Sequence, residues 1–190
     1  MKKKSLSDMT LAELWELFPI RLVEHNQNWV QYYDEMEQFL KKILSDCKIT
    51  RISHIGSTAI HGIWAKDIVD ILLEIACVED MERVAKITED NGFIRMSTQT
   101  GRIDLNNGYT SDGFANKVYH LHVRYDGDNS ELYFRDYLNE HPDVAKAYEQ
   151  MKLELWKKYE HNRDAYTNAK KEFVEKWTNE AKRIYGKRYI

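Results

Sequence analysis

Residues 54–74 constrain the fold of this 190-residue chain more than any other stretch. They predict a strand that ends at Gly56-Ser57, a short turn or helix, and a second, strongly apolar strand over 67–76. Gly56 allows a tight turn, and the turn N–H groups with the Ser57 hydroxyl are suited to a phosphate. Asp70 stands inside the β-branched run of the second strand, where an unpaired buried carboxylate is costly. We therefore expect Asp70 to be paired, hydrated or bound to a cation.

The remaining elements are predicted from hydrophobic periodicity and from turn residues. Helices are expected over 11–18, 28–45, 78–91, 131–139, 143–161 and 163–185, and further strands over 48–55, 93–96 and 117–125. The polar segment 97–113, rich in Gly and Asn, is expected to be a loop or a loose hairpin that is mobile over a site. We expect one domain over 1–190, with an N-terminal helical appendage (1–20), an α/β core (21–125) and C-terminal helices (126–190).

Longer strings of residues point to a family. The string His-Ile-Gly-Ser-Thr-Ala-Ile-x-Gly-Ile-x-Ala-Lys-x-Ile-Val-Asp-Ile occupies 54–71, and His-Leu-His-Val, Phe-Arg-Asp-Tyr-Leu and two Tyr-x-x-x-Lys pairs follow. Over roughly 20–185 the chain resembles the GrpB family, and its Gly-Ser turn followed by Asp resembles the nucleotidyltransferase superfamily. The resemblance implies an α/β (α+β) fold, with a small mixed sheet packed by helices and a helical C-terminal part.

The resemblance also implies a function, which is binding of a nucleotide or phosphorylated small molecule with Mg²⁺-dependent nucleotidyl transfer. In that scheme Gly56, Ser57 and Thr58 hold phosphates and Asp70 holds Mg²⁺. A single Asp supplies few oxygen ligands, so Mg²⁺ binding without nucleotide is expected to be weak. The alternative is a catalytically inactive ligand-binding or interaction module that kept the fold. A metal-dependent hydrolase that uses two histidines is a third class.

The second metal carboxylate is the main departure from the nucleotidyltransferase pattern. Such enzymes carry two carboxylates two residues apart, and here the second position is Leu72. Glu74 shares a strand face with Asp70 and is a candidate metal ligand. Its Cα should lie about 13 Å from that of Asp70 at ~3.3 Å per residue, too far to clamp two metal ions alone. Asp67, at the entrance of the strand, is expected to face solvent.

His120 and His122 are two residues apart on a predicted strand and therefore share a face. They are candidate catalytic residues with Asp70. We expect them to contact a phosphate or carboxylate, or to support Asp70, rather than to form a structural zinc site, because the cysteines Cys47 and Cys77 offer no obvious completion. A pair of hydrogen-bonded structural histidines is the alternative.

Four basic residues are candidate phosphate ligands: Lys66, Arg135, Lys152 and Lys170. For Lys66 and Arg135 the alternative is a local ion pair with the neighbouring aspartate. Lys152 and Lys170 each follow a tyrosine by four residues, so each pair shares a helix face. Solvated lysines above buried aromatic rings are the ordinary interpretation, whereas the repetition in two successive helices favours a shared anion site.

The net charge, the length of the apolar runs and the number of cysteines limit which partners the chain is expected to have. A net charge of −3 gives no overall basic field for nucleic acid. No apolar run approaches the ~20 residues of a membrane span, and no signal peptide is predicted. Two widely spaced cysteines are typical of reduced thiols in a cytoplasmic protein. We expect a small-molecule partner, no organic cofactor, no clear nucleic-acid partner and no membrane, and the oligomeric state stays open.

Overall fold

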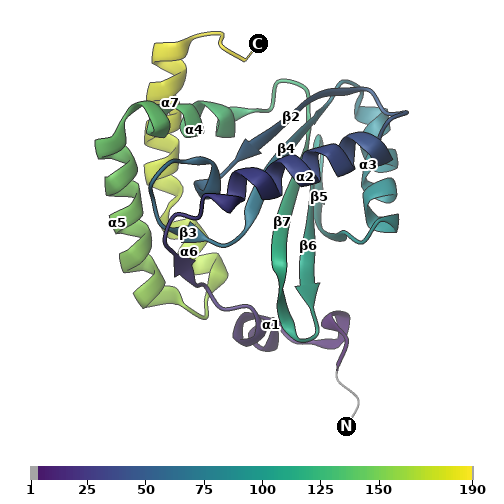
Figure 1. Cartoon of the computed structure of the whole chain (residues 1–190), viewed down its shortest axis with the longest axis horizontal. Helices are drawn as coiled ribbons and strands as arrows, with labels where there is room; N and C mark the ends of the chain where they lie inside the picture. The colour runs from purple at the N-terminus through teal and green to yellow at the C-terminus, as the bar shows by residue number, and fades with distance from the viewer. Residues whose placement is uncertain (1–3, 190) are drawn as a thin grey trace.

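A five-stranded mixed sheet organises the protein, whose computed structural model describes residues 4–189 (Figure 1). The strands, in their order across the sheet, are β2 (Ile49–Ile55), β4 (Val69–Ile75), β7 (Gly113–Tyr125), β6 (Arg102–Thr110) and β5 (Ile94–Gln99). β4 and β7 pair in parallel, and the other neighbours are antiparallel. The predicted α/β fold with a small mixed sheet is confirmed.

The two faces of β4 have different surroundings, as its alternation predicts. Val69, Ile71, Leu73 and Ile75 are all buried in the main apolar core. That face is covered by α2 (Asn28–Ile43) and α3 (Val78–Asp90). In Figure 1, α2 crosses in front of the sheet and α3 lies at its right-hand side. Trp29 and Val84 of these helices are fully buried against it. Asp70, Leu72 and Glu74 are left to the opposite face.

The C-terminal helices lie together at one side of the sheet (Figure 1). They are α4 (Ser130–Glu140), α5 (Pro142–Tyr159), α6 (Arg163–Ala169) and α7 (Lys171–Tyr185). Tyr137, Tyr148 and Trp177 pack in a second apolar core, which also takes up Ile60 and Ile63 after the β2 turn. The prediction of one continuous helix over 163–185 is wrong. The N–H of Lys170 bonds to the Thr167 carbonyl three residues back, and this tighter turn separates α6 from α7.

The segment 97–113 is not a loop, because most of it is regular sheet. β5 and β6 form one hairpin and β6 and β7 form the next. Ile103 and Leu105 are buried in the main core, so the strand alternates despite its polar composition. Gly108 permits a bulge near its end, where a side chain would meet the Lys117 carbonyl oxygen at 2.4 Å. The Gly and Asn residues therefore serve the strand rather than a mobile loop.

The N-terminal part of the described chain begins with a short 3₁₀ helix, η1 (Leu6–Asp8), and α1 (Leu11–Leu17). Thr10 and Glu13 form a capping box at the start of α1. Phe18 packs on the rings of Tyr109 and Phe114, which tether this segment to the β6–β7 hairpin. Residues 1–3 of the predicted appendage lie outside the described residues.

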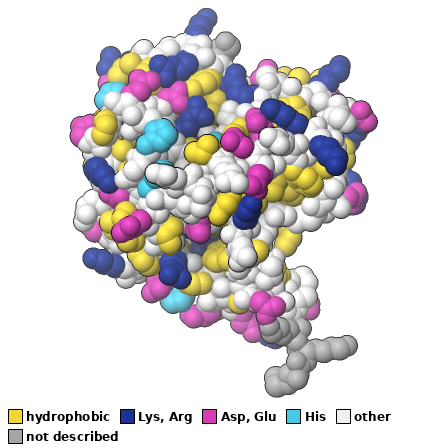
Figure 2. All heavy atoms as spheres, viewed as in Figure 1, with side chains coloured by type: hydrophobic (Ala, Val, Ile, Leu, Met, Phe, Trp, Pro, Cys, Tyr) yellow, Lys and Arg dark blue, Asp and Glu magenta, His cyan; other side chains and the backbone are white. Residues whose placement is uncertain are grey.

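A small two-stranded ribbon completes the fold beside the turn that follows β2. β1 (Leu22–Val23) pairs with β3 (Ala65–Lys66), and this pairing fixes the backbone of Lys66. The turn itself contains η2 (Ser57–Ala59), as the predicted turn or short helix requires. Basic and acidic side chains are intermixed over the face in Figure 2. No helix among residues 4–189 is long and apolar enough to cross a membrane.

Candidate functional site

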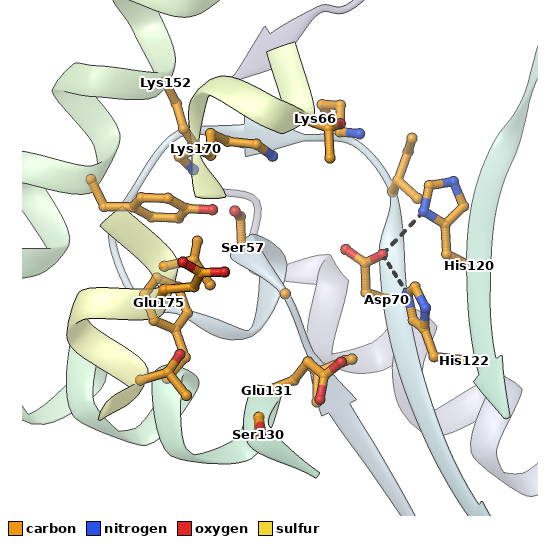
Figure 3. A pocket seen from close by; sticks show the side chains of 18 of the residues that line it. Ser57, Lys66, Asp70, His120, His122, Ser130, Glu131, Lys152, Lys170 and Glu175 are labelled. Carbon is orange, nitrogen blue, oxygen red and sulfur yellow. Dashed lines mark hydrogen bonds and ion pairs between the residues drawn. The ribbon is translucent and has the colours of Figure 1, made fainter. Parts of the chain in front are cut away.

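A cavity of about 760 Å³ lies between the polar face of the sheet and the C-terminal helices (Figure 3). Most of the predicted site residues line it: Gly56, Ser57, Lys66, Asp70, His120, His122, Lys152 and Lys170. They come from the β2 turn, three strands and the helices α5 to α7, so only the folded chain brings them together. The structure thus brings these residues together, and their roles in phosphate binding, metal binding or catalysis stay predictions.

The turn after β2 presses directly against the Asp70 carboxylate. Ile55 is the register partner of Asp70, so the next residue, Gly56, faces that side chain. Gly56 has φ of 71°, and a side chain on it would lie 2.3 Å from Oδ2 of Asp70. Glycine is therefore required here both by the backbone and by the carboxylate.

Gly56→Ala is expected to destabilise the protein more than Gly62→Ala does. Both glycines have positive φ, but a side chain on Gly62 meets nothing within 4 Å. The backbone strain of about 1–2 kcal/mol is common to both variants. The clash with Asp70 should add about 1–3 kcal/mol for Gly56→Ala only. Urea unfolding of both variants measures the difference, and equal losses would contradict the close contact.

Asp70 and the two histidines form a compact cluster, joined by the dashed lines in Figure 3. The parallel register places His120 beside Asp70 and His122 one step further along β7. Oδ1 of Asp70 lies 3.1 Å from Nδ1 of His120 and 3.2 Å from Nε2 of His122. The other ring nitrogens are also engaged, His122 Nδ1 by Asp104 at 2.9 Å and His120 Nε2 by the Tyr109 hydroxyl at 2.8 Å.

The charges of this cluster follow from burial and from these contacts. Burial alone would raise the pKa of Asp70, but hydrogen bonds from both histidines hold it well below its usual range. Burial alone would lower the pKa of His122, but Asp104 and Asp70 outweigh it and raise the pKa to about 9. At His120 the effect of burial exceeds that of the Asp70 carboxylate, so its pKa is lowered. In the absence of any bound group, one imidazolium thus lies between two carboxylates.

Three lysines line another side of the cavity (Figure 3). Lys66 comes from β3, Lys152 from α5, and Lys170 from the junction of α6 and α7. Lys152 is only 1% exposed and donates to the Trp64 carbonyl oxygen. Within the described residues, none of the three lysines forms an ion pair with a carboxylate.

Burial lowers the pKa of all three ammonium groups, to about 7 for Lys66 and Lys152 and to about 8 for Lys170. The charge of Lys170 contributes further at Lys66 and Lys152, and Arg163 adds to the effect at Lys66 and Lys170. The cavity therefore holds three lysines whose charges repel one another and that no carboxylate of residues 4–189 pairs directly.

Thr58 and Arg135, both predicted phosphate ligands, do not line the cavity. The Thr58 hydroxyl lies 2.9 Å from Nε2 of His54, whose pKa burial lowers to about 4. Arg135 lies on α4 and donates to the His54 carbonyl oxygen at 2.9 Å and to Asp136 at 2.8 Å. Both side chains thus brace β2 and its turn from behind, which corrects their predicted position.

Glu74, the predicted second metal ligand, is not part of the cluster either. It is fully buried and pairs with Arg51 at 3.0 Å. Its other oxygen accepts from Asn129 Nδ2 at 2.9 Å and from the Gly127 N–H at 3.1 Å. The strand spacing had already predicted that Glu74 lies far from Asp70. The contacts with Arg51, Asn129 and Gly127 give Glu74 a structural role instead. Asp67 is exposed, as expected, and its carboxylate also accepts from the Trp29 indole at 2.6 Å.

Sequence reasoning missed three residues that complete the site: Asp104, Tyr109 and Arg163. Asp104 and Tyr109 lie on β6, in the segment predicted as a loop or a loose hairpin, so no strand face was assigned to them. The Asp104 carboxylate alternates with Ile103 and Leu105, and that alternation is the signal that could have found it. Arg163 donates to the Tyr109 hydroxyl at 3.0 Å and has no motif in the sequence.

The fold of this chain is that of the nucleotidyltransferases. The poly(U) polymerase Cid1 bound to the UTP analogue UMPNPP aligns with a TM-score of 0.52, over 84% of this chain and 50% of that chain. A Cid1 mutant bound to MgATP aligns with a TM-score of 0.51, over 78% of this chain and 46% of that one. At 8% and 9% identity these likenesses show the fold alone.

The family follows from closer relatives. The model of the GrpB protein family matches residues 19–180, and the chain belongs to this family. A glutamate-rich protein GrpB of Alkalihalophilus pseudofirmus is 37% identical over 84% of this chain and 94% of its own length. The UPF0157 protein YqkA of Bacillus subtilis is 31% identical over 91% of this chain, which spans only 51% of that longer protein. The crystal structure of GrpB from Enterococcus faecalis aligns with a TM-score of 0.75 at 28% identity, over 87% of this chain and 99% of that one.

The donor set around Asp70 does not fit Mg²⁺, the ion that the fold class implies. Mg²⁺ takes oxygen ligands in octahedral geometry. Here Asp70 is flanked by two imidazole nitrogens within 3.2 Å. Leu72, at the position of the second carboxylate, is fully buried and packs against Ile55. The two strand positions therefore supply one carboxylate where a pair of magnesium ions needs two or more.

Proposed function

We propose that this cavity binds a nucleotide or another phosphorylated small molecule, with the phosphates held by Lys66, Lys152 and Lys170. The observation that carries the proposal is the convergence of three lysine side chains, from three separate elements, without a paired carboxylate. Burying ammonium groups that lack an anion is costly. In the ligand-free fold of residues 4–189 the lysines have only neutral partners, such as the Trp64 carbonyl oxygen and the Tyr148 and Tyr166 rings, and a polyanion would supply the missing counter-charge.

The neighbouring groups support a phosphate ester in particular. The Gly56-Ser57 turn adds a hydroxyl and backbone donors to the same cavity. A volume of about 760 Å³ is large enough for a nucleotide-sized ligand. The carboxylate of Glu131, also at the lining, has a buried oxygen without a hydrogen-bond partner. An oxygen of this kind suits a hydroxyl or amino group on the unphosphorylated part of the ligand.

Binding is favoured over two-metal nucleotidyl transfer by the burial of Leu72. A leucine has no ligand atom, and this one packs with Ile55 and Leu132 in an apolar cluster. Pyrophosphate release from each triphosphate with a mixed pool of acceptors tests this choice directly. Release that disappears in Asp70→Asn would overturn binding as the sole activity.

Nucleoside triphosphates and inorganic triphosphate are expected to raise the unfolding temperature of the protein, whereas adenosine and uridine are not. The stabilisation is RT ln(1 + [L]/Kd), about 2.7 kcal/mol at a hundredfold excess over Kd. Affinity should fall between about pH 7 and pH 9, because Lys66, Lys152 and Lys170 with pKa values of about 7, 7 and 8 lose their charges there.

Calorimetry near pH 7.5 in two buffers of different ionisation enthalpy provides a second readout. Bound phosphate favours the charged lysines, so binding should take up protons from the buffer. Protection by uridine as strong as that by its triphosphate, or an affinity that does not change with pH, would contradict the proposal.

A further inference from the structure

We propose that Asp70, His120 and His122 bind one divalent transition-metal ion of the Zn²⁺ or Co²⁺ type, through Nδ1 of His120, Nε2 of His122 and a carboxylate oxygen. The inference does not depend on the phosphate ligand, because it concerns a different side of the cavity. Each of the three residues offers one ligand atom, and these atoms all lie within 4.8 Å of one another. Among the described residues, no other three carboxylates, imidazoles or thiols bring their ligand atoms this close together.

The distances suit a small ion with short bonds. Zn²⁺ binds nitrogen and oxygen at about 2.0–2.2 Å, so neighbouring ligand atoms of a tetrahedral site lie about 3.4 Å apart. The two imidazole nitrogens are 3.1 and 3.2 Å from Oδ1 of Asp70. These two distances are within a few tenths of an ångström of the required ligand spacing, and the third, between the two imidazole nitrogens, is at most 4.8 Å. The ligands come from two adjacent strands in register.

The outer contacts are those that metal-bound histidines have. Such histidines nearly always bond through their second ring nitrogen to a carboxylate or another fixed polar group. Nδ1 of His122 is held by Asp104, which Arg124 fixes in turn at 2.6 Å. Nε2 of His120 is held by the Tyr109 hydroxyl, to which Arg163 donates. Both rings thus present their remaining nitrogen to Asp70 in a fixed orientation.

His122 has a carboxylate at each ring nitrogen, Asp104 on one side and Asp70 on the other. Without a metal ion, hydrogen bonds to both carboxylates require the imidazolium, which carries a proton on each nitrogen. A metal ion between Nε2 and Oδ1 of Asp70 would take the place of the second proton, while Nδ1–H still donates to Asp104. Both carboxylates then remain paired.

The choice of ion follows from the donors. Two imidazoles favour Zn²⁺, Co²⁺ and their neighbours over Mg²⁺, which needs oxygen. The sequence argument against zinc concerned a closed structural site completed by cysteine. Here the three side chains are between 16% and 25% exposed and face the cavity, so a fourth position is open to water or a ligand. Three protein ligands with an open position are typical of reactive rather than structural zinc sites.

Metal titration of the chelator-treated full-length protein tests the proposal. Zn²⁺, followed by calorimetry, should bind at one ion per chain and at least about 100-fold more tightly than Mg²⁺. Co²⁺ should give the visible absorption of a low-coordinate site, and Zn²⁺ should abolish it. In the unsubstituted chain, Co²⁺ should also shift the ring NMR signals of His120 and His122, a readout that requires no variant.

Variants locate the ion. His122→Asn should remove Co²⁺ absorption, and Asp104→Asn, which touches no metal, should weaken affinity about 10–100-fold. His161→Asn, an exposed histidine beside Glu16, is the matched control and should leave affinity unchanged. Circular dichroism checks that each variant is folded. Three results would each overturn the assignment: Co²⁺ binding that survives in His122→Asn, NMR shifts confined to other histidines, or Mg²⁺ that competes equally with Zn²⁺. The cluster would then be held together by the proton between His122 and Asp70 rather than by a metal ion.

Discussion

Arg51→Met is expected to lower the free energy of unfolding by about 3–5 kcal/mol, because it leaves the carboxylate of Glu74 buried without its counter-charge. Glu74 has no exposed surface, and Arg51 contacts it at 3.0 Å across the β2–β4 pair. Hydrogen bonds from Asn129 and Gly127 remain but carry no formal charge. For a chain of this size the unfolding temperature should fall by roughly 2–4 °C per kcal/mol.

Two further variants test the reason for this loss. Arg83→Met removes an exposed arginine from α3 and should stay within about 0.5 kcal/mol of the unsubstituted protein. Glu74→Gln added to Arg51→Met removes the uncompensated charge while keeping an oxygen for Asn129, so it should recover part of the stability. Chemical denaturation measures all three. A loss in Arg51→Met no greater than in Arg83→Met would mean that the pair does not support the sheet.

Lys66→Met is expected to weaken the binding of nucleoside triphosphates by about 10–100-fold, since each 1.4 kcal/mol of lost charge interaction is a factor of ten. The same variant should be more stable than the unsubstituted protein when no ligand is present. Folding lowers the pKa of Lys66 from 10.5 to about 7, so between these values the unfolded chain binds more protons than the folded one. The charge therefore opposes folding fully below about pH 7, and this penalty disappears as the pH rises to about 10.5.

The gain in stability of Lys66→Met should accordingly be largest at about pH 7 and vanish above about pH 10.5. Unfolding temperatures across this range measure it, and calorimetry measures affinity. Lys157→Met, on the exposed side of α5, is the control and should change neither quantity. If Lys66→Met lost stability without ligand and kept its affinity, Lys66 would serve the fold and the phosphate proposal would lose its main support.

The sequence predicted the centre of the site better than its surroundings. Alternation in the second strand and the His-x-His spacing placed Asp70, His120 and His122 on shared faces, because period-two geometry acts over a few residues. Residues that depend on strand pairing were not accessible in this way. Arg51 meets Glu74 only through the β2–β4 register. The segment of β6 was assigned to a loop or a loose hairpin because polar and Gly residues mask its short alternation.

The parallel pairing of β4 with β7 also determines at which stage of folding Asp70, His120 and His122 come together. Asp70 and His120 are 50 residues apart in the sequence, and α3, β5 and β6 lie between them. Closing so long a loop costs conformational entropy before the strand contacts form, so strand pairings of this kind form slowly. A chain emerging from synthesis therefore carries Asp70 alone until β7 docks at the centre of the sheet. The cluster thus exists only where β4 and β7 have paired, so an ion bound there stabilises the paired sheet relative to any state in which β7 is detached.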